Sequence, residues 1–176
     1  SWIADEGHVI AVTRRNSPNL LSNCDFQVWG SGPAAAPSLW TLSGSGATVA
    51  RAAGTSALVG LDTYAAAITR VGTDCQLVTS VLSDALRRDL EGEAVIGGIW
   101  AHTTAASRGR PRITDGVDTS NSTGYHAGNS ALEWQTVSHT VKAAQNTLDF
   151  SYRIETGDVV ATISNPVLVR GSSIPD

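Results

Sequence analysis

Short runs of β-branched or alternating apolar residues recur along this chain, and each run is followed by a cluster of Gly, Ser, Asn, Asp or Pro. Successive side chains of a strand point to opposite faces, so this two-residue period predicts strands rather than helices. Strands at this spacing are typical of an antiparallel sandwich or jelly roll. The segments that we predict as strands are His8–Val12, Leu20–Trp29, Trp40–Leu42, Ala47–Arg51, Tyr64–Thr69, Gln76–Leu82, Ala94–Thr103, Arg110–Thr114, Trp134–Val141, Thr147–Ile154 and Val159–Val169.

One segment departs from the strand pattern. Ser83 can cap a short helix in which Leu86 and Leu90 share a face at i, i+4 spacing, and Gly92 follows its end. The predicted fold class is therefore an all-β antiparallel sandwich, a jelly roll, with one short connecting helix.

The domain organisation follows from where the strand pattern becomes regular. The one boundary that we place falls near Pro18, after a polar stretch. Residues 1–18 are predicted to form an N-terminal arm, and residues 19–176 a single jelly-roll domain.

Composition excludes several classes of protein. The chain has 176 residues, the size of one domain, with 16% charged residues and a net charge of −4. A nucleic-acid-binding domain is expected to carry a basic patch, and a transmembrane helix needs about 18 consecutive apolar residues. We therefore expect neither a nucleic acid nor a membrane as a partner.

Seven segments follow one another along the chain in an order that matches a known set of motifs. They are Asn19–Trp29, Pro37–Leu42, Gly92–Trp100, Arg112–Gly116, Tyr125–Gly128, Glu133–Val137 and Ile163–Gly171. The first, N-L-L-S-N-C-D-F-Q-V-W, resembles the opening N-L-L-x-N-G-x-F-E-x-W of galactose-binding-like jelly rolls, a fold family that includes carbohydrate-binding modules of the family 4, 9 and 22 types. The resemblance covers residues 19–175, and its motifs are closer to the versions common in tailed-bacteriophage virion proteins.

This resemblance implies a function. It indicates a non-enzymatic bacteriophage virion structural protein, such as a capsid decoration, head-fibre or tail-fibre module at the virion surface, with host cell-surface glycan as a candidate ligand. Modules of this kind are expected to be homo-oligomers, and we favour a trimer. The alternative is a carbohydrate-binding module of a secreted enzyme that acts on glycans.

Motifs for catalysis are missing from the sequence. There is no G-x-S-x-G elbow and no H-E-x-x-H helix. The run Gly44–Val49 begins like a dinucleotide-binding loop, but Val49 stands where that loop needs a glycine. The chain is therefore predicted to be no enzyme and to need no cofactor.

The sequence also gives little support for a metal site or a disulfide. Asp115 and Asp118 flank a turn, but their spacing differs from the alternating ligands of a calcium loop. The resemblance implies a structural calcium at the positions of Gln27 and Asn165, which carry amides here instead of carboxylates, so we expect no metal. The two cysteines, Cys24 and Cys75, fit one disulfide or two buried thiols equally well.

Candidate carbohydrate-binding residues are sought among exposed aromatic side chains with hydrogen-bonding groups beside them. A sugar presents apolar C–H faces, which pack on an aromatic ring, and many hydroxyls. In the strand 94–103, alternation assigns Val95, Gly97, Ile99 and Ala101 to the core and the intervening residues to the other face. The residues predicted to contact a glycan are Trp100, His102, Arg112 and Tyr125. Packing of Trp100 against another subunit or the short helix is the alternative. Trp40 and Trp134 are predicted to pack in the core.

The arm carries an apolar surface of its own. An extended apolar segment is costly to leave in water, so it is predicted to dock on other virion proteins or on another copy of the chain. Closure of its own sandwich is the alternative. The predicted contact residues are Trp2, Ile3, Val9, Ile10 and Val12.

Overall fold

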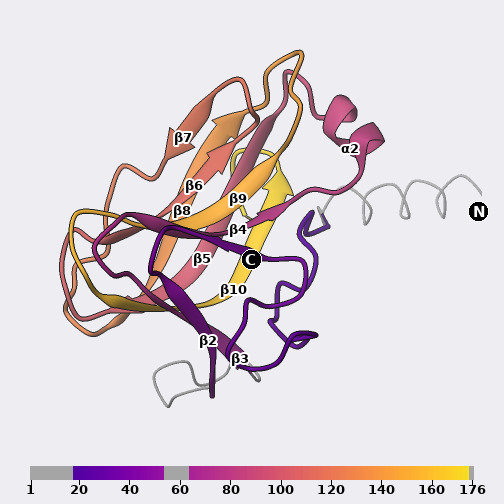
Figure 1. Ribbon diagram of the computed structural model, residues 1–176. Coiled ribbons are helices and arrows are strands. Elements are labelled where there is room, and N and C mark those ends of the chain that lie inside the picture. The colour runs from indigo at the N-terminus through magenta and orange to yellow at the C-terminus, as the bar shows by residue number, and fades with distance from the viewer. Residues whose placement is uncertain (1–17, 54–63, 175–176) are drawn as a thin grey trace, which may run out of the picture.

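Two antiparallel sheets pack face to face in the computed structural model, which describes residues 18–53 and 64–174 (Figure 1). Sheet A has the strand order β1-β4-β9-β6-β7, and sheet B the order β2-β3-β10-β5-β8. The strands of sheet A are β1 (Thr41–Ser43), β4 (Cys75–Ser80), β9 (Asp149–Ile154), β6 (Gly109–Thr114) and β7 (Thr119–Asn121). Those of sheet B are β2 (Thr48–Ala53), β3 (Tyr64–Thr69), β10 (Val160–Arg170), β5 (Ala94–Thr103) and β8 (Leu132–Thr140). The predicted all-β sandwich is confirmed.

The core lies between the sheets because every second residue of each strand points inward. Phe150 and Tyr152 of β9 and Ile99 of β5 are fully buried there. Gly97 of β5 faces Phe150, and a Cβ at this position would overlap the phenyl ring. The absence of a side chain at Gly97 therefore lets Phe150 of sheet A reach the backbone of sheet B. The predicted division of β5 between its two faces is confirmed.

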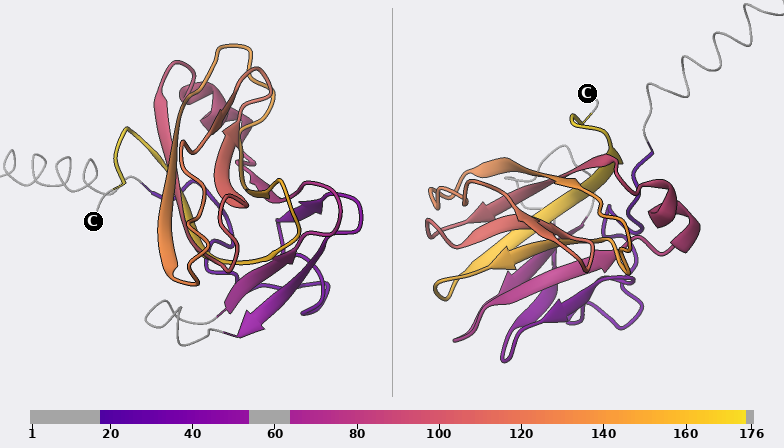
Figure 2. Two further views of the ribbon diagram at one scale, coloured as in Figure 1. Left: turned by 90° about the vertical axis from the view of Figure 1, so that its left-hand side faces the viewer. Right: turned by 90° about the horizontal axis from the view of Figure 1, so that it is seen from above.

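The one helix in the described ranges, α2 (Asp84–Asp89), lies beside one end of the sandwich (Figures 1 and 2). Ser83 caps it as predicted, and its hydroxyl accepts a hydrogen bond from the Leu86 N–H at 3.2 Å. Leu90 follows the last helical residue and is buried in the core. The helix is a connector between β4 and β5.

The prediction of a strand over Leu20–Trp29 is wrong. This segment is a series of turns, with φ of 50° at Asn23 and 53° at Phe26. The amide of Asn23 donates to the carbonyl of Val28 at 2.9 Å and accepts from its N–H at 3.0 Å. Phe26 is nevertheless fully buried, in an edge-to-face contact with Trp40. The apolar residues of the segment fill the end of the core without pairing as a strand.

The start of the described chain is joined to its end. The Leu20 N–H donates to the carbonyl of Leu168 at 2.8 Å, and the Asn19 side chain accepts from the Leu168 N–H at 3.0 Å. The predicted contact residues Trp2, Ile3, Val9, Ile10 and Val12, and the predicted strand His8–Val12, lie outside the described residues.

The structure also answers the open question of the two cysteines and allows a search for membrane-spanning helices. Cys24 and Cys75 are free thiols, and Cys75 is buried. Within the described ranges, no helix is long and apolar enough to cross a membrane.

Candidate functional site

The outer face of sheet A is mostly polar because the residues that alternate with its core positions, Val78 apart, carry hydrogen-bonding side chains. Where β4, β9 and β6 pair, these residues line up in rows that cross the strands. The rows are Gln76–Arg153–Arg110, Val78–Ser151–Arg112 and Ser80–Asp149–Thr114. On β7, Asn121 continues the middle row beside Arg112. Neighbouring strands lie about 4.8 Å apart, so a row across five strands spans about 19 Å.

Ion pairs fix the first row in place. Glu155 is 9% exposed, and its carboxylate pairs with Arg153 Nε at 2.6 Å and Arg110 Nη2 at 3.0 Å. Arg153 also pairs with Asp74 at 3.1 Å. Desolvation opposes ionisation of Asp74, but hydrogen bonds from Arg70 and Arg153 hold its pKa below the ordinary value. These groups satisfy one another and form a rigid edge to the face.

Tyr125 belongs to the same network. Its hydroxyl donates to Glu155 Oε2 at 2.5 Å, and the Arg110 guanidinium lies 4.4 Å from the centroid of its ring. The hydrogen bond to Glu155 raises the pKa of Tyr125, so the hydroxyl keeps its proton. An aromatic ring is thereby held in a fixed position beside the arginines.

Arg112 differs from its neighbours. It makes no hydrogen bond or ion pair with any residue in the ranges 18–53 and 64–174. Its Nε is buried without a partner, whereas its two terminal nitrogens keep some solvent exposure. Burial lowers the pKa of Arg112, and the positive charge of Arg153 lowers it further. The middle of the face therefore presents an unpaired cation.

A small pocket of about 100 Å³ opens at the β1 end of this face. Ser43, Asp74, Gln76 and Arg153 contribute to its lining. This volume is small beside the roughly 300 to 1,000 Å³ of a typical ligand pocket. The face is therefore an extended surface with a small recess and does not enclose a ligand.

The outer face of sheet B is less charged. The rings of Trp100 and Trp134 lie with their centroids 5.3 Å apart, and a Cβ at Gly98 would overlap Trp134. Trp134 is 38% exposed, so its predicted place in the core is wrong, whereas Trp40 is buried as predicted. On β8 the alternation places Gln135 and Val137 inward and turns Trp134 outward.

The four predicted glycan contacts are divided between the two sheets. Trp100 and His102 lie on the outer face of sheet B, on β5. Arg112 lies on the outer face of sheet A, and Tyr125 bonds to the network at its edge. The core separates the two pairs, so they do not form one contiguous surface.

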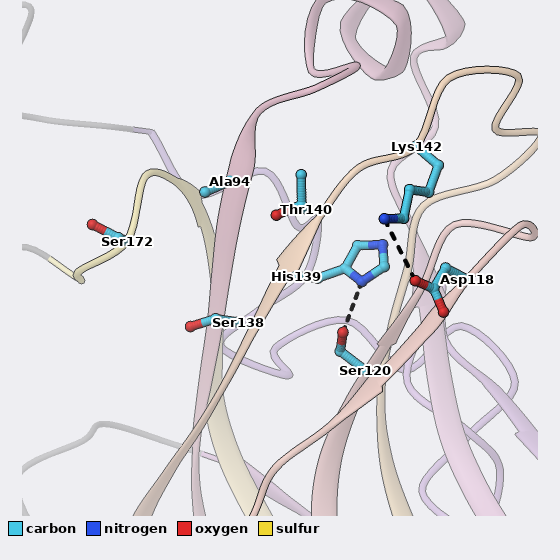
Figure 3. Close-up of a pocket in the computed structure, with 8 residues that line it drawn as sticks. All are labelled: Ala94, Asp118, Ser120, Ser138, His139, Thr140, Lys142 and Ser172. Atoms are coloured by element: carbon cyan, nitrogen blue, oxygen red, sulfur yellow. Dashed lines mark hydrogen bonds and ion pairs between the residues drawn. The ribbon is translucent and has the colours of Figure 1, made fainter.

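A second pocket, of about 290 Å³, lies at the edge of the sandwich where β7 and β8 approach each other (Figure 3). His139 bridges two groups there: Nδ1 is 3.0 Å from Ser120 Oγ, and Nε2 is 3.0 Å from Asp115 Oδ2. We call Asp115, Ser120 and His139 the edge cluster. It has the composition of a Ser-His-Asp triad, but the ring nitrogens are reversed relative to the serine hydrolase arrangement.

Asp115 is the most highly bonded member of the edge cluster. It is fully buried, and its carboxylate accepts hydrogen bonds from the backbone N–H groups of Val117, Asp118 and Lys142 at 2.7 to 2.8 Å. Burial opposes its ionisation, but these donors and His139 outweigh burial and lower the pKa to about 2. The cluster joins the β6–β7 turn of sheet A to β8 of sheet B.

No family model matches the sequence, and no curated protein matches it in a sequence search. Solved structures share its fold. TmCBM61 in complex with β-1,4-galactotriose matches with a TM-score of 0.60 and 18% identity, over 88% of this chain and 100% of that chain. The CBM22-1 xylan-binding domain of Paenibacillus barcinonensis Xyn10C matches with a TM-score of 0.61 and 13% identity, over 91% of this chain and 99% of that chain. The fold is that of the jelly-roll carbohydrate-binding modules.

One structural neighbour comes from a virus. The enzymatically active domain of bacteriophage CBA120 tailspike protein 4 matches with a TM-score of 0.64 and 14% identity, over 87% of this chain. The match covers only 21% of the tailspike chain. It is therefore a likeness to one part of a larger protein.

Several residues of the sheet A face were not singled out by the sequence analysis. Gln76, Arg153, Glu155 and Asn121 all fall in this group. Alternation within Asp149–Ile154 places Arg153 outward, because Phe150, Tyr152 and Ile154 point inward. The pairing of β9 between β4 and β6 has no local signal, so the rows could not be predicted.

Proposed function

We propose that this chain is a non-catalytic carbohydrate-binding module whose glycan lies across the outer face of sheet A. The observation that carries the proposal is the set of rows of hydrogen-bonding side chains on that face, beside the fixed ring of Tyr125. A sugar needs both hydrogen-bonding groups and an aromatic surface; this face carries the hydrogen-bonding groups, and the Tyr125 ring, stacked on Arg110, lies at its edge. The solved structures of similar fold support the choice of ligand class.

The shape of the face favours an oligosaccharide over a single sugar. The rows extend over several strands, and the recess at the β1 end has a volume of only about 100 Å³. An oligosaccharide bound across this face would therefore make many weak contacts with the rows of side chains. Asn121, which is exposed and next to Arg112, is the contact that can be removed with least disturbance to the fold.

Affinity electrophoresis of the full chain tests this proposal. Gels contain xylan, β-1,4-galactan or polygalacturonate, and we expect at least one polymer to retard the protein. Asn121→Ala should reduce the retardation, whereas the control Thr136→Ala, at an exposed position of β8 on sheet B, should not. Migration unaffected by all three polymers, and by dextran sulfate as well, would contradict the proposal.

We further propose that the module is carried on a bacteriophage virion, joined to other virion proteins through residues 1–18. The sequence resemblance to tailed-phage proteins and the likeness to part of a tailspike support this location. The alternative, a module of a secreted glycan-active enzyme, is supported by the matches to xylan-binding modules.

Light scattering separates these two settings. The virion setting predicts a homo-oligomer, with a trimer favoured, that dissociates when residues 1–18 are deleted. A full-length chain that stays monomeric and still binds polysaccharide would favour the secreted module instead.

A further inference from the structure

The sheet A face carries three arginines at its centre, and among the described residues only two of them pair with a carboxylate of the face. Arg110 and Arg153 share Glu155, and Arg153 also uses Asp74. Arg112 stands beside them with no hydrogen-bond or ion-pair partner in the described part of the chain. We call Arg110, Arg112 and Arg153 the arginine cluster.

Acidic groups nearby are already committed to other partners. Asp149 lies one row away on β9, where it accepts hydrogen bonds from Ser80, at 2.6 Å, and from Thr147. Glu155 is occupied by two arginines and a tyrosine. Neither makes an ion pair with Arg112, although the guanidinium is partly buried. Burial of a cation without a counter-ion is unfavourable, so an anion that binds there would gain more than it would at an exposed arginine.

The geometry of Arg112 suits a planar or tetrahedral anion. Its two terminal nitrogens keep some solvent exposure, and this end of a guanidinium can bind two oxygens of one carboxylate or sulfate at once. Asn121 lies beside Arg112 in the same row and, being exposed, offers an amide for neighbouring hydroxyls, whereas Ser151 on the other side is buried and donates to Gln76. These groups together match one charged sugar within a chain.

We infer that the glycan bound by this face is acidic, and that Arg112 binds its carboxylate or sulfate group. The inference rests on the proposed function and specifies the class of its ligand. The whole chain carries a net charge of −4, so general attraction of a polyanion is not expected. Preference for an acidic glycan must then come from a local site.

The test compares one polymer with and without its charge. Affinity electrophoresis of the full chain is run with polygalacturonate, with its fully methyl-esterified form, and with dextran and dextran sulfate. We expect the charged form of at least one pair to bind at least tenfold more tightly than its neutral form. A preference confined to polygalacturonate identifies a carboxylate, and one confined to dextran sulfate identifies a sulfate.

Two variants connect that preference to Arg112. Arg112→Gln should abolish it, whereas Arg88→Gln, which removes one exposed positive charge from α2, should leave it intact. Equal loss of the preference in both variants would overturn the inference in favour of general electrostatics. Equal binding to the charged and neutral forms would overturn the inference but leave the proposed function standing. Failure to bind these polymers, xylan or β-1,4-galactan would contradict both.

Discussion

The edge cluster and the arginine cluster are both polar, but they differ in how completely their polar groups are paired within the protein. Every member of the edge cluster has partners, and Asp115 alone accepts four hydrogen bonds. In the arginine cluster two members are paired, while Arg112 has no partner among the described residues. A fully satisfied buried group stabilises the fold, and a partly buried charge without a partner has interactions left to make with a ligand. The contrast separates a structural group from a candidate binding group.

Removal of Asp115 is expected to have the largest effect on stability. Asp115→Ala leaves three backbone N–H groups and the His139 ring without their acceptor in a buried position. We expect the free energy of unfolding to fall by about 3 kcal/mol, measured by urea denaturation.

Asp118→Ala is the matched control for Asp115→Ala. Asp118 lies three residues away, its side chain is 55% exposed, and its ion pair with Lys142 is 3.7 Å long. Its loss should cost less than about 1 kcal/mol. Similar losses in the two variants would show that the edge cluster is not a main source of stability.

Acid should remove the contribution of Asp115. Its folded-state pKa of about 2 lies below the ordinary value of 3.8, so folding favours the ionised form. The stabilisation, about 2 kcal/mol, is complete above roughly pH 5 and is lost as the pH falls through 2. The measurement is the difference in unfolding free energy between the wild type and Asp115→Asn at each pH, which cancels the titration of other carboxylates. A difference that stays constant down to pH 2 would contradict this account.

Much of the fold was predictable because strand alternation is a local property. The bounds predicted for β3 and β5, Tyr64–Thr69 and Ala94–Thr103, are those of the structure. β7 (Thr119–Asn121) was missed because three polar residues carry no apolar period, and its pairing with β6 defines it. The opposite error occurred at Leu20–Trp29, where a strand was predicted but is not formed. Buried apolar residues alternate there within a series of turns.

The candidate site was predictable only in part. Arg112 and Tyr125 were singled out by type and spacing, and the structure places them on or beside one face. Trp100 and His102 were grouped with them because sequence cannot tell which of two sheets a strand joins. Within the described ranges Arg112 is unpaired because Glu155 bonds to its neighbours instead. Those contacts depend on the pairing of strands that are distant in the chain, so the sequence did not reveal them.

Trp134→Ala tests which outer face binds the glycan. The ring packs on Trp100 and over Gly98, so its loss should lower the unfolding free energy by about 1 to 2 kcal/mol. Retardation by polysaccharide in the affinity gels should not change, because Trp134 lies on the sheet opposite the arginine cluster. Loss of binding with an intact fold, checked by circular dichroism, would move the site to sheet B and to the predicted contacts Trp100 and His102.

The smallest effect on stability is expected at Arg112 and the informative comparison is with Arg110, two residues away on β6. Arg110→Gln leaves the buried Glu155 with one arginine fewer and should cost about 1 to 2 kcal/mol of unfolding free energy. Arg112→Gln breaks no hydrogen bond or ion pair in the described ranges and removes a charge close to two other arginines, so the change should be within about 0.5 kcal/mol. Urea denaturation of the two variants measures the difference. Equal destabilisation would mean that Arg112 is held by the fold as firmly as Arg110, and the distinction between a structural charge and a ligand-binding charge on this face would fail.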